Sequence, residues 1–157
     1  MRKKKIGVKH FGPLIDITDP CYDRNVWCRM NGVNIKEGDY TCRIWKHSEK
    51  MKFNGKAYTD TRVGIIGIYL DDRIPKDKDF EKIGIICVDA GLAGFFTDKP
   101  DYTDEQWMEL CNNLGKEDVW IRPEGFFSSS GYGDGSYPVL AAKDPKGEIF
   151  ALEIRFL

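Results

Sequence analysis

Several chemical features are scarce in this 157-residue chain. It has two histidines, and its 24 Lys+Arg residues nearly balance 25 Asp+Glu residues, for a net charge of −1. Without an excess of positive charge, general nucleic-acid binding is not expected, although a local basic patch remains open. No apolar run approaches membrane-spanning length, and no apolar segment follows the basic residues 2–5, so neither membrane association nor a secretory signal is expected.

Cysteine spacing gives no sign of a disulfide scaffold or a zinc site. The five cysteines contain no C-x-x-C pair: Cys21, Cys28, Cys42, Cys87 and Cys111. Cys87 and Cys111 lie in apolar patterns, where free cysteine behaves as a small hydrophobe. We therefore expect free thiols, a reducing cytoplasmic location and no structural zinc.

Apolar periodicity predicts one β-rich α+β domain over residues 1–157. Turn signals separate about seven to nine apolar or alternating segments, most of them in hairpin order. We expect a curved antiparallel sheet, a partly open barrel or a sandwich. Residues 24–38 are expected to be irregular. The expected strands are residues 6–11, 14–18, 40–47, 62–70, 83–88, 92–96, 119–122, 137–143 and 148–156.

One main helix is expected at about residues 103–114. Thr103 and Gln106 form a capping box, and Gly115 is a suitable end. An apolar face follows at helical spacing: Trp107, Leu110, Cys111 and Leu114.

Two hairpin turns are expected, at Asn54-Gly55 and at residues 144–147. In the last strand, alternation predicts that Glu153 and Arg155 face water.

A glycine-rich tract occupies residues 131–139, with the sequence Gly-Tyr-Gly-Asp-Gly-Ser-Tyr-Pro-Val, after three serines. Ordering such a tract costs conformational entropy, so we expect backbone positions that only glycine adopts, or a close approach to another group. A strand follows rather than a helix, which excludes the standard phosphate-binding loops. A different backbone nest for an anion remains open, as does an irregular loop without a ligand.

Three aspartates lie where expected strands begin or end beside Gly or Pro: Asp19, Asp89 and Asp134. If these ends converge, the carboxylates could hold a divalent metal, or one could act as a general base. The alternative is that each one caps turn N–H groups. Cys21 lies beside Asp19, but His10 and His47 are distant in sequence, so a structural cysteine is favoured over a nucleophile.

A basic segment with interleaved aromatic residues spans residues 43–56. Five cations against Glu49 give it a net charge of +4, with Trp45 and Phe53 between them. This pattern fits nucleotide stacking, or alternatively a solvated hairpin. If the glycine tract binds a ligand, Arg43 and Trp45 are its natural partners.

Residues 16–22, 88–94 and 131–139 carry the motifs Asp-Pro-Cys-Tyr, Val-Asp-x-Gly and Gly-Asp-Gly-x-Tyr-Pro-Val. With these motifs the chain resembles a domain-of-unknown-function family of small bacterial and phage proteins. The resemblance implies no established activity, but it groups the three segments.

We therefore expect a non-catalytic binding protein for a small polar or phosphorylated ligand that resembles a nucleotide. In the phage setting that the resemblance implies, the protein would sequester this ligand. No cofactor is expected. One alternative is a hydrolase using Asp19, Asp89 and Asp134, with or without a divalent metal. Another is an inhibitor or immunity module anchored by Trp27, Trp120, Phe126 and Phe127. The expected ligand-binding residues are Asp19, Cys21, Tyr22, Arg43, Trp45, Asp89, Gly91, Tyr132, Gly133, Asp134, Gly135 and Tyr137.

Overall fold

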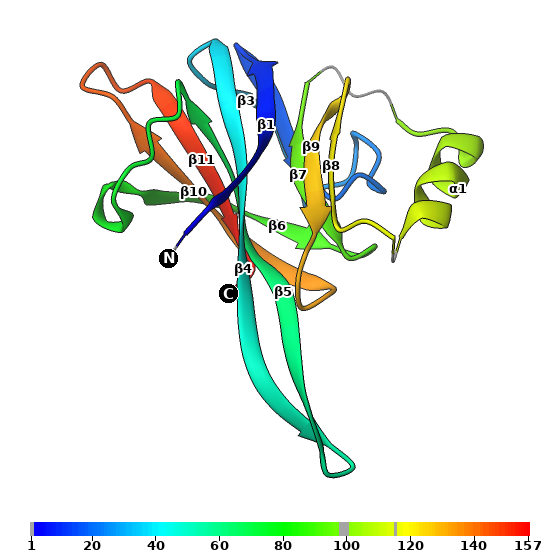
Figure 1. The fold of residues 1–157 in the computed structure, drawn as a ribbon. Helices are drawn as coiled ribbons and strands as arrows, with labels where there is room; N and C mark the ends of the chain where they lie inside the picture. Colours follow the sequence, from blue (N-terminus) through cyan, green and yellow to red (C-terminus); the bar gives the residue numbers. More distant parts are fainter. Residues whose placement is uncertain (1, 98–100, 115) are drawn as a thin grey trace.

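The computed structural model describes residues 2–97, 101–114 and 116–157, which form two antiparallel sheets and one α-helix (Figure 1). The six-stranded sheet has the spatial order β1 (Lys4–Phe11), β4 (Gly38–Phe53), β5 (Lys56–Leu70), β11 (Ile149–Arg155), β10 (Gly135–Lys143) and β6 (Glu81–Val88). The five-stranded sheet has the order β3 (Met30–Asn34), β2 (Leu14–Thr18), β7 (Leu92–Phe96), β9 (Gly125–Ser129) and β8 (Val119–Arg122). The β-rich α+β prediction is confirmed, and the sheets do not close into a barrel.

The main core lies between the two sheets. Phe95 and Phe126 of the five-stranded sheet are fully buried in one cluster with Ile66 and Leu152 of the six-stranded sheet. Each strand contributes alternate residues to this interior, as the period of two requires. The arrangement is therefore a β-sandwich.

Helix α1 (Asp104–Asn113) packs on the outer face of the five-stranded sheet (Figure 1). The capping box is confirmed, because Thr103 accepts a hydrogen bond from the Gln106 backbone and the Gln106 side chain accepts one from the Thr103 backbone. Only part of the expected apolar face is covered: Leu110 is buried, whereas Leu114 is 39% exposed. Gly115, expected to end the helix, lies outside the described residues.

Two strands lie where the sequence predicted none. β3 falls in the segment expected to be irregular, because Met-Asn-Gly-Val-Asn shows little apolar alternation. β9 carries the sequence Gly-Phe-Phe-Ser-Ser, which merges into the serine and glycine tract. β3 forms by pairing with β2, and β9 forms by pairing with β7 and β8. In both cases the neighbouring strands outweigh the local sequence pattern.

The β4–β5 hairpin is much longer than predicted and projects out of the sandwich (Figure 1). Along β4, pairing with β1 ends at Ile44, and along β5, pairing with β11 begins at Ile65. Residues 46–62 therefore pair within the β4–β5 hairpin alone, from Lys46 with Val63 to Phe53 with Lys56. We call residues 46–62 the arm. Its Asn54-Gly55 turn is confirmed, with positive φ at both residues (49° and 76°).

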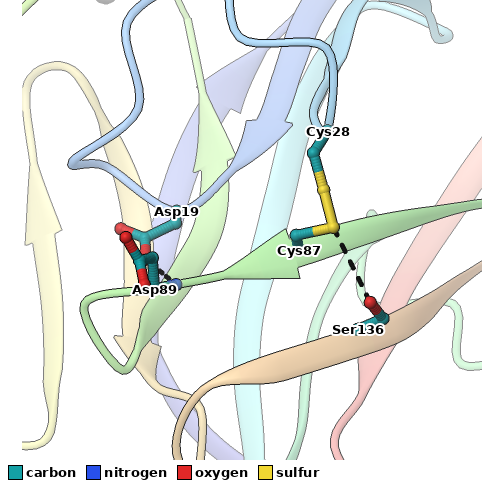
Figure 2. The surroundings of a disulfide bond; sticks show 5 residues. All are labelled: Asp19, Cys28, Cys87, Asp89 and Ser136. Atoms are coloured by element: carbon teal, nitrogen blue, oxygen red, sulfur yellow. Dashed lines mark hydrogen bonds between the residues drawn. A yellow bond between two sulfur atoms is a disulfide. The ribbon is translucent and has the colours of Figure 1, made fainter.

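A disulfide joins Cys28 to Cys87 (Figure 2), with Cα atoms 5.4 Å apart. The prediction of a free Cys87 is therefore wrong, because the two cysteines lie 59 residues apart and only the fold brings them together. Cys21, Cys42 and Cys111 are free, as expected. Two of the five cysteines therefore no longer support the expectation of a reducing cytoplasm. No helix in the described part of the chain is long and apolar enough to cross a membrane.

Thiol counting tests this pairing. Protein unfolded without reductant is expected to show three reactive thiols, and reduced protein is expected to show five. The double variant Cys28→Ser/Cys87→Ser should show three thiols in both states. It should also lose about 4 kcal/mol of stability, the loop-entropy value for a cross-link of this span. Five reactive thiols before reduction would contradict the pairing.

Candidate functional site

The buried carboxylate of Asp19 joins two of the three predicted segments (Figure 2). Its Oδ1 accepts a hydrogen bond from the Cys21 backbone N–H (2.9 Å), and its Oδ2 accepts two from the backbone N–H groups of Asp89 (2.8 Å) and Ala90 (2.6 Å). The side chain is 0% exposed. Of the two alternatives for Asp19, the geometry therefore supports the capping of turn N–H groups.

The third segment adjoins the same corner. The Ser130 backbone N–H donates to the Gly91 carbonyl (2.8 Å), and Gly135 pairs with Val88 at the start of β10. Burial raises the pKa of the Tyr22 hydroxyl, and the nearby charges of Asp89, Asp19 and Asp134 raise it further. The three turns are thus contiguous, with Asp134 close enough to Tyr22 to act on it electrostatically.

The glycine tract has an internal structural explanation. The Gly133 carbonyl accepts hydrogen bonds from the Ser130 hydroxyl (2.6 Å) and the Tyr137 hydroxyl (2.8 Å). Gly131 has φ = 71°, and a Cβ there would collide with the Val63 carbonyl of β5. The expectation of a glycine-only conformation and a close approach is confirmed at Gly131.

Tyr132, next in the tract, is 41% exposed and lies under the Arg62 guanidinium, 5.0 Å from the ring centroid. Arg62 also donates to the Gly131 carbonyl (3.1 Å). The tract is therefore fastened to the base of the arm.

A second buried carboxylate, Asp16, fixes the loop of residues 19–29. It pairs with the Arg29 guanidinium (3.0 Å), which in turn donates to the Tyr22 carbonyl (2.7 Å). Burial lowers the pKa of Arg29, and the charge of Asp16 opposes this shift. Farther along the loop, the Arg24 backbone N–H donates to the Asp101 side chain (3.0 Å), which ties the loop to the segment before α1.

A cleft of about 400 Å³ opens between this loop, the turn after β6 and the start of α1. We call it the acidic cleft, because among the seven lining residues that the structure describes three are aspartates and none is Lys or Arg. Burial raises the pKa of Tyr102, whose hydroxyl also donates to Glu124 (3.2 Å). The lining residues are Cys21, Asp23, Asp89, Ala90, Tyr102, Asp104 and Trp107.

Only Cys21 and Asp89 of the predicted site residues line the acidic cleft. Tyr102, Asp104 and Trp107 were missed as site residues, although the capping box located the helix that carries two of them. The missing information was tertiary, because no local pattern shows that this helix begins beside the Asp89 turn.

Cys21 is a poor candidate nucleophile. Burial raises the pKa of its thiol, and the charges of Asp19 and Asp89 raise it further. The histidines lie elsewhere: His10 contacts Glu37 and Asp39, and His47 contacts Glu49. Within residues 2–97, 101–114 and 116–157, no three His, Cys, Asp or Glu side chains are arranged to hold a metal ion.

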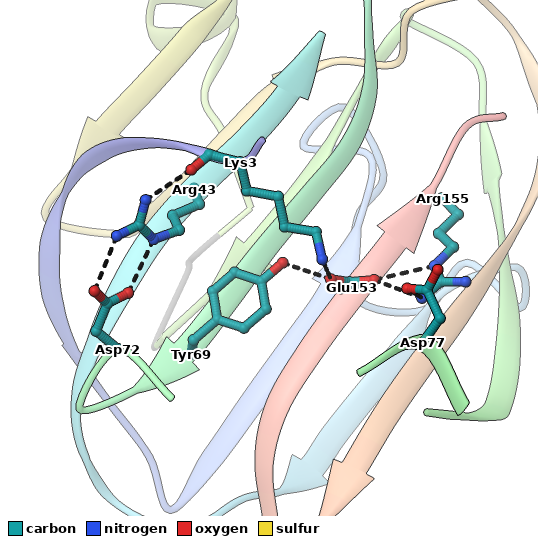
Figure 3. A network of polar contacts seen from close by, with 7 residues as sticks. All are labelled: Lys3, Arg43, Tyr69, Asp72, Asp77, Glu153 and Arg155. Carbon is teal, nitrogen blue, oxygen red and sulfur yellow. Dashed lines mark hydrogen bonds and ion pairs between the residues drawn. The ribbon is translucent and has the colours of Figure 1, made fainter. Parts of the chain in front are cut away.

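Arg43 and Trp45, predicted as ligand partners of the glycine tract, belong to different surroundings. Arg43 forms a bidentate pair with Asp72 (2.9 Å for both bonds) and donates to the Lys3 carbonyl (2.7 Å; Figure 3). Trp45 lies beside His47, with ring centroids 5.5 Å apart, and packs over Gly64. Both side chains are thus engaged on the outer face of the six-stranded sheet.

Glu153, on the same outer face, was expected to face water, and this prediction is wrong: it is 0% exposed. Its carboxylate accepts a hydrogen bond from Tyr69 (2.5 Å) and pairs with Lys3 (2.9 Å) and Arg155 (2.8 Å; Figure 3). Sheet alternation does place Glu153 outward, but Lys3 from the chain start covers it.

The Asp19 linkage predicts a large effect of a small substitution. Asp19→Asn should lower the free energy of unfolding in urea by about 2–3 kcal/mol, because three partly buried backbone N–H groups lose a charged acceptor. Asp23→Asn, an exposed neighbour, is the matched control and should change stability by less than about 0.5 kcal/mol. Equal stability of the two variants would contradict the linkage.

The Glu153 network predicts a second effect. Glu153→Gln should cost about 3 kcal/mol, because it leaves the Lys3 ammonium, whose side chain is 8% exposed, without its carboxylate. Glu148→Gln removes an exposed carboxylate from the same hairpin and should be nearly neutral. Thermal and urea unfolding measure both, and a neutral Glu153→Gln would refute the buried pair.

Comparison with known proteins adds no family. No protein-family model matches the chain, and no curated protein or solved structure shows significant similarity to it. The resemblance to a family of unknown function stays a prediction from three short segments.

Proposed function

We propose that this chain is a non-catalytic binding protein whose acidic cleft takes an organic cation, an ammonium or guanidinium group. The observation that carries the proposal is the lining: Asp23, Asp89 and Asp104 stand with Tyr102 and Trp107, and none of the described residues that line the cleft is Lys or Arg. Carboxylates form charge-assisted hydrogen bonds with such cations, and aromatic faces attract them. The cleft volume of about 400 Å³ is in the range of small-molecule sites.

The same charges disfavour the phosphorylated ligand expected from the sequence. A phosphate in this cleft would meet three carboxylates directly, with Asp19 and Asp134 close to the adjoining Tyr22. The N-terminus of α1, which could otherwise attract an anion, carries Asp104 and Glu105 in its first turn. A small polar ligand remains the proposal, and its charge is positive.

The hydrolase alternative has less support. Both oxygens of Asp19 accept backbone hydrogen bonds, so this carboxylate is engaged in the fold rather than open to a substrate. The raised thiol pKa of Cys21 also opposes nucleophilic attack at neutral pH.

The inhibitor or immunity alternative loses most of its predicted anchors. Trp120, Phe126 and Phe127 are buried, with exposed fractions of 5%, 0% and 0%, whereas Trp27 is 90% exposed. Trp27 lies on the loop that lines the cleft. An exposed aromatic residue beside the cleft suits a protein partner, so a Lys or Arg side chain of such a partner is a second source of the same cation.

Calorimetric titration tests the proposal with three sets of ligands: free polyamines and agmatine, a Lys- and Arg-containing peptide, and nucleotides. We expect heat with the cations and none with the nucleotides. Asp89→Asn should weaken cation binding about tenfold, equivalent to about 1.4 kcal/mol. Glu105→Gln, on α1 but outside the cleft, is the matched control and should bind normally.

The outcomes separate the alternatives. Peptide binding without polyamine binding identifies a protein as the source of the cation. Nucleotide binding that survives Asp89→Asn, or the absence of heat with every cation, would overturn the proposal.

A further inference from the structure

We propose that the arm, residues 46–62, is a binding element for duplex DNA, separate from the acidic cleft. The arm is a two-stranded antiparallel ribbon that leaves the sandwich (Figure 1). Such ribbons fit the major groove of B-DNA, which is about 12 Å wide.

One face of the arm carries cations and hydroxyl groups without a carboxylate. Lys50 pairs with Thr59 and Lys52 pairs with Ala57 across the two strands. The neighbouring Ser48 and Thr61 share a hydrogen bond of 2.9 Å. Ammonium and hydroxyl groups are the donors that proteins use on phosphate oxygens.

The other face is partly apolar and reaches the tip. Met51 and Tyr58 lie directly opposite each other and are 41% and 46% exposed. Phe53, beside the turn, is 69% exposed. An aromatic side chain at the tip is placed to contact base edges, including the thymine methyl group.

Charge is concentrated on the arm. Five cations against Glu49 and Asp60 give residues 46–62 a net charge of +3, which leaves −4 for the rest of a chain whose total is −1. The two carboxylates are already paired, Glu49 with His47 and Asp60 with Arg62. In the described part of the molecule, by contrast, Lys50, Lys52 and Lys56 form no ion pair.

The arm is long enough that the negative charge of the sandwich has little electrostatic effect at its tip. Eight residues, 46–53, extend roughly 26 Å at about 3.3 Å per residue. The Debye length at 0.1 M salt is about 10 Å, so charges on the sandwich are largely screened at the tip. This explains how a chain without net positive charge can still present a local DNA-binding surface.

A protein partner suits the arm less well. Specific protein interfaces use about 20–30 residues a side, whereas this face offers three apolar side chains, with Lys56 opposite Phe53 and the Glu49–Asp60 pair next to Met51 and Tyr58. The unpaired lysines point instead to a polyanion with regularly spaced charges.

Fluorescence anisotropy with a 30-base-pair duplex of mixed sequence and the full chain tests the proposal. We expect binding at low salt, with log K falling against log salt at a slope of about −2.7, the value for three released counterions. Lys50→Gln/Lys52→Gln/Lys56→Gln should abolish measurable binding. Phe53→Ala should weaken binding several-fold at an unchanged slope.

The control variant Lys78→Gln/Lys82→Gln/Lys146→Gln removes the same charge from exposed sites off the arm and should bind normally. Circular dichroism confirms that each variant is folded. No binding at 50 mM salt, or equal loss in the two triple variants, would overturn the proposal. So would arm-dependent self-association or capture of an acidic peptide in place of DNA binding.

Discussion

The Asp19 carboxylate supplies the acceptors for backbone N–H groups of two segments about 70 residues apart in the chain. A backbone N–H group that is shielded from water and has no acceptor costs free energy. Because Asp19 accepts hydrogen bonds from both segments, it holds the loop after β2 and the turn after β6 together at one corner of the fold. The disulfide from Cys28 to Cys87 and the contact of Ser130 with Gly91 join the same corner. The acidic cleft exists because that corner also meets the start of α1.

Local patterns in the sequence were enough to predict most of the fold. Apolar alternation located the strands that line the core, the Thr103 capping box located α1, and Asn54-Gly55 located the turn of the arm. These features depend on residues near one another in the chain. β3 and β9 escaped prediction because their neighbours, rather than their own residues, stabilise them.

The candidate site was only partly predictable, for a physical reason. The three segments do converge, yet the cleft beside them takes Tyr102 from the segment before α1 and Asp104 and Trp107 from α1 itself. Arg43 and Glu153 show the same limit: sequence spacing gives the face of a strand, but it does not show that Lys3 and Asp72 cover that face.

Charge is segregated over the molecule, although the total is nearly zero. Negative charge gathers around the cleft and positive charge on the arm, while pairs such as Glu153 with Lys3 are internal to the fold. A neutral total therefore says little about partners, because two surfaces of opposite sign attract different ligands. The cleft suits cations and the arm suits polyanions.

Hydrogen exchange at the backbone N–H groups of Cys21, Asp89 and Ala90 tests the central linkage most directly. In the native protein these amides should be strongly protected, although they lie in turns. In Asp19→Asn all three should lose protection together while amides of the sandwich core keep theirs. Rapid exchange of these amides in the native protein, or unchanged protection in the variant, would contradict the role assigned to Asp19.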